Sequence, residues 1–178
     1  FRSAERVTQE ALVDYVGDLV AALNLRDYVI AGISLGGGLA LGHLLSGSGS
    51  PVGAVLLGSY GIMDRMAEGP LAGLWHRLAY WSVRSGLLEW TNRQYRAHPG
   101  LVRISLGSLV ADRSRRTPEL VTQLRRAVAA GDGLTAFGHW QRDQTGPDRL
   151  RTDYTPRLGE VAAPVLLVHG SRDRGVPV

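Results

Sequence analysis

The sequence contains no cysteine and no lysine, and these absences exclude several classes of function. Without cysteine the chain forms neither disulfides nor cysteine-based metal sites. Cysteine usage therefore does not indicate whether the protein works in an oxidising or a reducing compartment. Its 20 basic residues are all arginine, scattered among 16 acidic residues, which argues against a nucleic-acid-binding surface despite the net charge of +4. The longest segment without a charged residue, 28–63, is broken by glycine, serine and histidine. It therefore does not fit a membrane span of about 20 apolar residues.

The length of 178 residues and the hydrophobic content of 44% are those of one ordinary globular domain. The first third of the chain alternates between amphipathic segments and uncharged, non-alternating runs, which are typical of strands buried on both faces in a parallel sheet. The order helix, strand, helix, strand predicts an α/β fold with right-handed crossovers. The predicted elements are helices over 8–24, with Thr8 as N-cap, and over 35–45, and strands over 28–33, 52–57 and 163–170.

The middle of the chain, 62–154, has a different character. It shows no strand pattern, carries 14 arginines against 9 acidic residues and holds all four tryptophans. We therefore divide the chain into an α/β core, 1–61 and 155–178, and a helical insertion, 62–154. We expect the tryptophans to form the core of the insertion first and a wall of a substrate site second. Helical patterns run over 71–81, 101–110 and 117–131, the last with Thr117 as N-cap and Gly131 as stop.

A glycine-rich motif follows the first predicted strand, where Gly32-Ile33-Ser34-Leu35-Gly36 fits G-x-S-x-G. The pattern alone is weak, but it lies where a buried strand ends and a helix begins, as a nucleophile elbow requires. So sharp a turn predicts a strained backbone at Ser34 that lifts its hydroxyl clear of the sheet. Strand and helix then nearly touch, so we expect side chains at Gly32 and Gly36 to collide. The N–H of Leu35, at the start of the new helix, is free to bind a developing oxyanion.

With these residues the sequence resembles the α/β-hydrolase superfamily, specifically its members with a helical cap. The resemblance is strong in two places, "AGISLGGGLAL" and "PVLLVHGSRDRGVPV". The first implies Ser34 as the nucleophile. The second is similar to the late strand of the family followed by G-x-x-D-x-x-V-P, which implies Asp173 as the acid that orients the triad histidine. The insertion 62–154 then corresponds to the cap.

Two parts of the family pattern are not found in the sequence. The triad histidine should follow Asp173, and none of the five histidines present fits the general base. The second oxyanion N–H should come from a glycine-rich loop, of which "FRS" (1–3) resembles the tail. We therefore expect the chain to be the middle of a longer hydrolase and to be inactive by itself. Asp64, shortly after the second strand, is the alternative acid.

The resemblance implies a serine hydrolase that acts on a small, partly apolar carbonyl substrate, such as an ester, a thioester, a lactone or the carbon–carbon bond of a vinylogous diketone. It implies no metal and no organic cofactor. Two other classes stay open. Gly32, Gly36 and Gly38 also fit the glycine pattern of short-chain dehydrogenases, which bind a nucleotide at a helix N-terminus, although the catalytic lysine of that family is absent here. A non-catalytic binding protein with the hydrolase fold is the third class.

Overall fold

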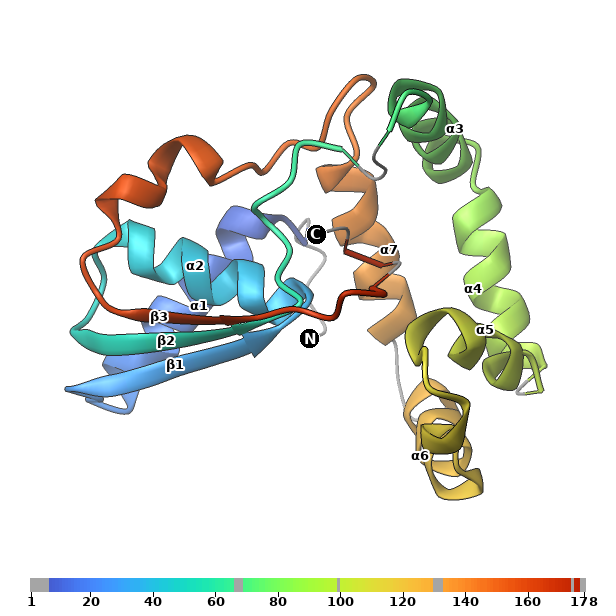
Figure 1. Cartoon of the computed structure of the whole chain (residues 1–178), viewed down its shortest axis with the longest axis horizontal. Coiled ribbons are helices and arrows are strands. Elements are labelled where there is room, and N and C mark those ends of the chain that lie inside the picture. The colour runs from blue at the N-terminus through green and yellow to red at the C-terminus, as the bar shows by residue number, and fades with distance from the viewer. Residues whose placement is uncertain (1–6, 66–68, 99, 130–132, 174, 177–178) are drawn as a thin grey trace.

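The computed structural model describes residues 7–65, 69–98, 100–129, 133–173 and 175–176. Within these residues the chain forms a three-stranded sheet, two helices beside it and a group of five further helices (Figure 1). The strands are β1 (Tyr28–Ile33), β2 (Pro51–Leu57) and β3 (Val165–Val168). The α-helices are α1 (Gln9–Ala22), α2 (Leu35–Ser46), α3 (Ala72–Arg84), α4 (Leu87–Ala97), α5 (Leu101–Leu109), α6 (Pro118–Ala129) and α7 (Gly133–Gln144). Two short 3₁₀ helices are η1 (Arg113–Arg115) and η2 (Thr155–Glu160).

The three strands are parallel and lie in the order β1-β2-β3. Ala54 in β2 is paired with Ile30 in β1 and with Val165 in β3. Because the strands are parallel, all three end at the same edge of the sheet. Figure 1 shows α3 to α7 gathered on the side toward which the strand arrows point. The predicted α/β class with a parallel sheet is therefore confirmed.

The core lies between the sheet and α2. Helix α2 lies against β1 and β2, and α1 packs on α2. Ala40 and Leu41 of α2 meet Ala54 and Leu56 of β2, and none of these four side chains is more than 3% exposed. Alternation along β2 points both of its core residues to this face. The predicted cap of the first helix is confirmed, because the Thr8 side chain accepts a backbone hydrogen bond from the first turn of α1.

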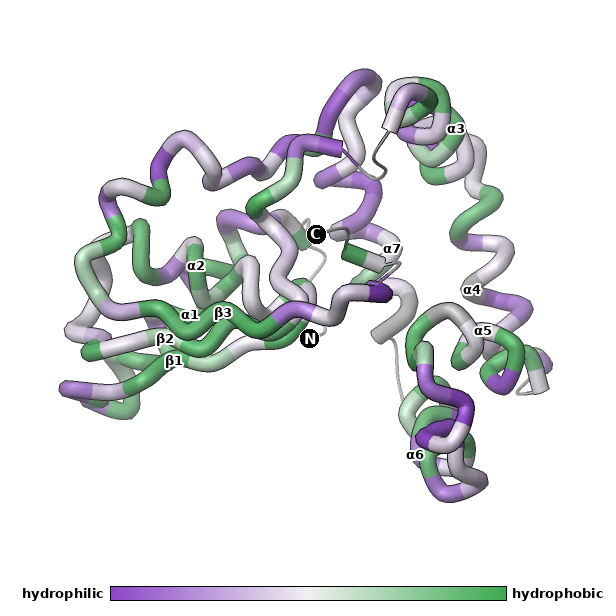
Figure 2. Tube along the Cα trace, in the orientation of Figure 1, coloured by the Kyte–Doolittle hydropathy of each residue, from purple (hydrophilic) through white to green (hydrophobic). Residues whose placement is uncertain are grey.

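The opposite face of the sheet differs from the prediction of strands buried on both sides. Val29 and Ile33 of β1 are 59% and 70% exposed, and Leu166 and Val168 of β3 are exposed as well. Figure 2 shows β3 as apolar along its length and β1 and β2 as largely apolar, with pale segments between. Such composition signals two buried faces, but among the described residues helices cover one face only. The strand assignments are correct, whereas the predicted burial is wrong for this face and, in β3, also for the side of α2, where Val165 and Leu167 are exposed.

The region 62–154 is helical, as predicted. Among its described residues the β-type pairing is an isolated antiparallel bridge between Thr145 and Leu150. The predicted helices correspond to α3, α5 and α6, and Thr117 accepts the N–H of Leu120 at 3.3 Å at the start of α6. The predicted stop at Gly131 lies outside the described residues. Helices α4 and α7 complete the group, and the sequence analysis did not predict them.

The tryptophans are placed differently from the prediction. Trp75, Trp81 and Trp90 are 57%, 63% and 56% exposed, so they do not form a core. Trp140 of α7 alone among the four is buried, at 6% exposure. Helical periodicity identified the apolar side of α3 but not whether that side faces inward. The expectation of a tryptophan core in the insertion is therefore wrong for three of the four residues.

Candidate functional site

The turn between β1 and α2 holds Ser34 in a strained backbone conformation. Its φ and ψ are 52° and −119°, a region that side-chain-bearing residues rarely adopt. Four hydrogen bonds hold this conformation in place. The Ser34 N–H donates to the carbonyl of Leu57 at 2.9 Å, and the Ser34 carbonyl accepts from Gly37, Gly38 and Tyr60 at 3.0, 3.2 and 3.0 Å. The side chain of Ser34 is exposed at the end of the sheet, and strain of this kind is typical of functional sites.

The two glycines that flank Ser34 play different roles in this turn. A Cβ at Gly32 would collide with the carbonyl group of Gly36 and would lie 2.6 Å from the N atom of Gly37. At Gly36 a Cβ would meet no described atom within 4 Å. The expected collision is therefore present at Gly32 and wrong at Gly36. The backbone of Gly36 makes the close approach, while its own Cβ direction points into open space.

Helix α2 begins at Leu35, directly after the strained residue. The first N–H groups of a helix have no carbonyl acceptor within the helix, and they lie at the positive end of its dipole. Gly37 and Gly38 use their N–H groups to bind the Ser34 carbonyl. The N–H of Leu35 precedes them at the helix start, beside the exposed serine side chain. This arrangement can stabilise negative charge that develops next to Ser34.

Asp173 lies in the loop that follows β3, and backbone groups orient its carboxylate. Oδ1 accepts the N–H of Gly175 at 2.8 Å and that of Val176 at 3.0 Å. The N–H of Asp173 itself donates to the carbonyl of Gly170 at 2.9 Å. After β2, Gly58 has φ of 50°, and a Cβ there would lie 3.0 Å from Asp173 Oδ2. The glycine thus leaves room for the carboxylate at the end of the sheet.

Ser34 and Asp173 line one pocket of about 340 Å³ at the carboxyl ends of the three strands. Ile33, Leu57 and Val168, the last residues of the strands, form its floor. The structure therefore brings together two residues that are 139 positions apart in the chain. The alternative acid Asp64 is not among the described residues that line this pocket. Its side chain is 62% exposed and lies 3.8 Å from the guanidinium of Arg65.

A second pocket, of about 420 Å³, extends from Ser34 toward the helices of the insertion. Ser34 and Leu35 line it from the sheet side, and its lining is predominantly apolar. Aromatic rings form one wall. Trp140 packs edge-on against Tyr60, with ring centres 4.9 Å apart, and stacks on Phe137 at 5.6 Å. A pocket of this size and lining can hold a small, partly apolar molecule beside the serine hydroxyl.

Buried hydrogen bonds hold these aromatic residues in place. The indole Nε1 of Trp140 donates to Gln9 Oε1 of α1 at 2.9 Å, and the Tyr60 hydroxyl donates to Gln144 Oε1 at 3.1 Å. Burial raises the pKa of Tyr60, so its side chain stays a neutral hydroxyl. Sequence reasoning did not find Tyr60 in this site. The one available signal was its position, directly after the second strand and close to the strand end that carries Gly58.

Three of the described histidines contact groups other than the Ser34 side chain. His43 is fully buried in α2, where its Nε2 lies 2.6 Å from the Tyr28 hydroxyl, and burial lowers its pKa. His76 Nε2 lies 3.0 Å from the carbonyl of Gly146. His169 Nε2 lies 2.9 Å from the Val176 carbonyl and 3.9 Å from Asp173 Oδ2. None of the histidines that the structure describes lines either pocket at Ser34.

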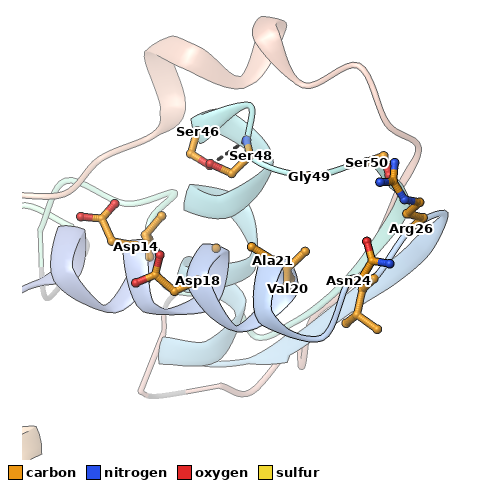
Figure 3. Close-up of a pocket in the computed structure, with 13 residues that line it drawn as sticks. Asp14, Asp18, Val20, Ala21, Asn24, Arg26, Ser46, Ser48, Gly49 and Ser50 are labelled. Carbon is orange, nitrogen blue, oxygen red and sulfur yellow. Dashed lines mark hydrogen bonds between the residues drawn. The ribbon is translucent and has the colours of Figure 1, made fainter.

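A larger pocket, of about 930 Å³, lies at the other end of the sheet, between α1 and the loop after α2 (Figure 3). Its lining is polar and includes Asp14, Asp18 and Arg26, but none of the motif residues. Size alone does not make it the site, because none of the three serines that line it has the positive φ of Ser34. The described residues contain no group of three histidine, aspartate or glutamate side chains placed to hold a metal ion. They also contain no helix long and apolar enough to cross a bilayer.

No protein-family model and no curated protein matches the sequence. Solved structures do match the fold. An esterase from Thermogutta terrifontis aligns with 96% of this chain at a TM-score of 0.63 and 21% identity, over 56% of its own length. The epoxide hydrolase CorEH aligns with 97% of this chain at a TM-score of 0.66 and 14% identity, over 61% of its own length. An alpha/beta hydrolase fold protein from Burkholderia ambifaria aligns with 99% of this chain at a TM-score of 0.64 and 18% identity, over 60% of its own length. The chain thus spans just over half the length of these structures.

Proposed function

We propose that this chain, which has part of the α/β-hydrolase fold, supplies the nucleophile and the acid of a serine hydrolase. The observation that carries the proposal is the pocket at the strand ends. There an exposed serine in a strained turn and a carboxylate oriented by backbone N–H groups line the same cavity. A strained serine at a strand-to-helix turn is the arrangement of a nucleophile elbow. The exposed hydroxyl and the oriented acid support hydrolysis more directly than the fold does, because one fold hosts many functions.

The reaction we propose is acyl transfer to Ser34. Its Oγ attacks the carbonyl carbon of the substrate while a histidine takes the hydroxyl proton, and the carbonyl oxygen becomes an oxyanion. The N–H of Leu35 donates a hydrogen bond to that oxyanion. The histidine then protonates the leaving group, which departs and leaves an acyl-serine. Water, deprotonated by the same histidine, releases the acid and restores the serine hydroxyl.

In this scheme Asp173 orients the histidine and stabilises its protonated form. We propose that the histidine comes from the part of the fold that this chain does not span, since the matched structures are considerably longer. The same holds for a second oxyanion donor. The described histidines support this assignment, because none of them lines either pocket at Ser34.

The substrate we propose is a small, partly apolar ester, thioester or lactone, or a molecule with a carbon–carbon bond next to a carbonyl. The pocket of about 420 Å³ supports this choice through its apolar lining and the wall of Tyr60, Phe137 and Trp140. The serine at position 34 argues against epoxide hydrolysis despite the similarity to CorEH, because that chemistry uses an aspartate nucleophile in this superfamily. We further propose that 1–61 and 155–178 form the core and 62–154 the cap, since the pocket lies between them.

The test is the hydrolysis of short-chain p-nitrophenyl esters by the polypeptide that carries the complete fold. We expect Ser34→Ala to abolish turnover, while Ser48→Ala, at another exposed serine far from the pocket, leaves kcat unchanged. Circular dichroism of both variants shows whether the fold is kept. Full turnover by a folded Ser34→Ala variant would refute the proposed nucleophile. Binding of such esters without turnover in the unaltered protein would instead indicate a non-catalytic binding protein.

A further inference from the structure

Helix α3 presents its apolar side to solvent. The outward side chains are here called the α3 stripe, and all are at least 50% exposed: Leu71 at the N-cap and Leu74, Trp75, Leu78 and Trp81 within the helix. They recur at three- and four-residue steps, so they form one continuous face. The inward face consists of smaller or polar residues, and its buried members are Ala72, His76 and Val83.

This orientation is the reverse of an ordinary surface helix, which turns its apolar face to the core. The inward face is nevertheless fixed. The Val83 carbonyl accepts a hydrogen bond from Arg142 of α7 at 3.4 Å, and His76 contacts the Gly146 carbonyl. The α3 stripe is therefore not needed to hold α3 in place. Contiguous exposed apolar surface of this kind marks an interaction site.

The charge on α3 indicates what the stripe contacts. The helix carries two arginines, Arg77 and Arg84, and its sequence contains no acidic residue. Both arginines are exposed, and they lie on the helix beside the stripe rather than within it. Leucine and tryptophan on one side of a helix, with arginine at the border, are typical of a helix that lies in the plane of an anionic membrane surface.

The open face of the sheet provides a useful contrast. Val29, Ile33, Leu166 and Val168 are also exposed and apolar, but β1 and β3 carry no charged residue. Among the described residues, β1 and β3 are the edge strands of the sheet, and the outer edge of each pairs with no other strand. Such a surface fits another polypeptide, because strand edges need hydrogen-bond partners. Beyond its first turn, the backbone groups of α3 are paired within the helix, and tryptophan at the border of the α3 stripe suits the interface between water and lipid.

We infer that the α3 stripe docks on the surface of a bilayer that contains anionic lipid. The aromatic and leucine side chains enter the headgroup boundary, and Arg77 and Arg84 pair with lipid phosphates or carboxylates. Ala79, Ser82 and Val83 of α3 also line the pocket at Ser34. Docking of α3 therefore holds this pocket close to the membrane surface. The inference does not depend on the chemistry at Ser34.

Co-sedimentation with vesicles tests this inference on the 178-residue chain. We expect binding to vesicles of four parts phosphatidylcholine and one part phosphatidylserine, and about 30-fold weaker binding to pure phosphatidylcholine. Arg77→Gln with Arg84→Gln should lower the affinity for the anionic vesicles by a similar factor, about fivefold for each arginine. Leu74→Ser with Leu78→Ser should abolish binding. Leu166→Ser is the matched control, because Leu166 is 59% exposed outside the stripe, and it should bind normally.

Quenching by brominated lipid locates the contact. Trp75→Phe with Trp81→Phe keeps the stripe apolar but removes its fluorophores, so binding should persist while quenching is largely lost. Absence of binding to the anionic vesicles would overturn the inference, as would equal losses in the stripe variants and in Leu166→Ser. A lipid-free dimer that Leu74→Ser with Leu78→Ser converts to a monomer would also overturn it, since the stripe would then face a second copy. Circular dichroism confirms that each variant is folded.

Discussion

The two glycines that flank Ser34 should respond to alanine in opposite directions. Gly32→Ala places a Cβ against the backbone of Gly36 and 2.6 Å from the N atom of Gly37. Backbone atoms at the start of α2 cannot move aside as a flexible side chain would, because their hydrogen bonds to Ser34 hold them. Overpacking typically costs 1–3 kcal/mol, and we expect Gly32→Ala to lose about 3 kcal/mol of unfolding free energy.

Gly36→Ala is the matched control in the same motif. Its Cβ would meet no described atom within 4 Å, and Gly36 has helical backbone angles in the first turn of α2. Alanine there lowers the conformational entropy of the unfolded chain, so we expect a gain of about 0.5–1 kcal/mol. For a domain of this length the two variants should differ in melting temperature by roughly 7–16 °C.

Urea unfolding followed by far-ultraviolet circular dichroism measures both effects. The slope of the transition should stay unchanged, which shows that the native fold is kept. If Gly32→Ala is too unstable to purify, the sign of Gly36→Ala still tests the account. Equal destabilisation by the two substitutions would refute the reasoning, because it would mean that both glycine positions are sterically closed.

Three further predictions concern residues around the site. Asp173→Asn in the polypeptide that carries the complete fold should lower kcat by a factor on the order of 10³–10⁴, because an amide no longer stabilises the protonated histidine; an unchanged kcat in an ester hydrolysis assay would remove Asp173 from the mechanism. Trp140→Phe leaves the buried Oε1 of Gln9 without its donor and should cost about 1–3 kcal/mol in urea unfolding, whereas Trp90→Phe, at an exposed tryptophan, should cost little. Stability should also fall with acid because of His43: burial lowers its pKa from the ordinary value of 6.5, so the unfolded state binds the proton more readily. The stability contributed by neutral His43 is thus complete above about pH 6.5 and is lost as the pH falls below it. The variant His43→Gln should therefore show a flatter dependence of the unfolding free energy on pH below about 6.5. An equally steep dependence in that variant would assign it to other groups.

Local patterns predicted the part of the fold that local physics determines. The uncharged run at 28–33 is β1, and the helix after Ser34 begins at Leu35 as the motif requires. The strained backbone at Ser34 was predictable because a serine between a buried strand and a helix, two residues after Gly32, fits a sharp strand-to-helix turn. Thr8 was predictable as a cap because, directly before a helix, its hydroxyl can accept a hydrogen bond from a backbone N–H of the first turn.

Features that depend on contacts between distant segments were not predictable. The spacing of apolar residues in α3 revealed an apolar face, but the direction of that face depends on what packs against the helix. Trp75 and Trp81 were therefore expected in the core of the insertion, whereas both are exposed. The pairing of Trp140 with Gln9 joins positions 131 residues apart, and no sequence signal links them. The open side of Gly36 depends on the angle between strand and helix, which the motif does not specify.

Labelling with a fluorophosphonate probe tests the central claim most directly. The claim is that the turn at position 34 presents a serine hydroxyl ready to attack a carbonyl. In the polypeptide that carries the complete fold, mass spectrometry should find the covalent adduct on Ser34, and Asp173→Asn should slow its formation. An adduct on a different serine, or no adduct on a folded protein, would contradict the account.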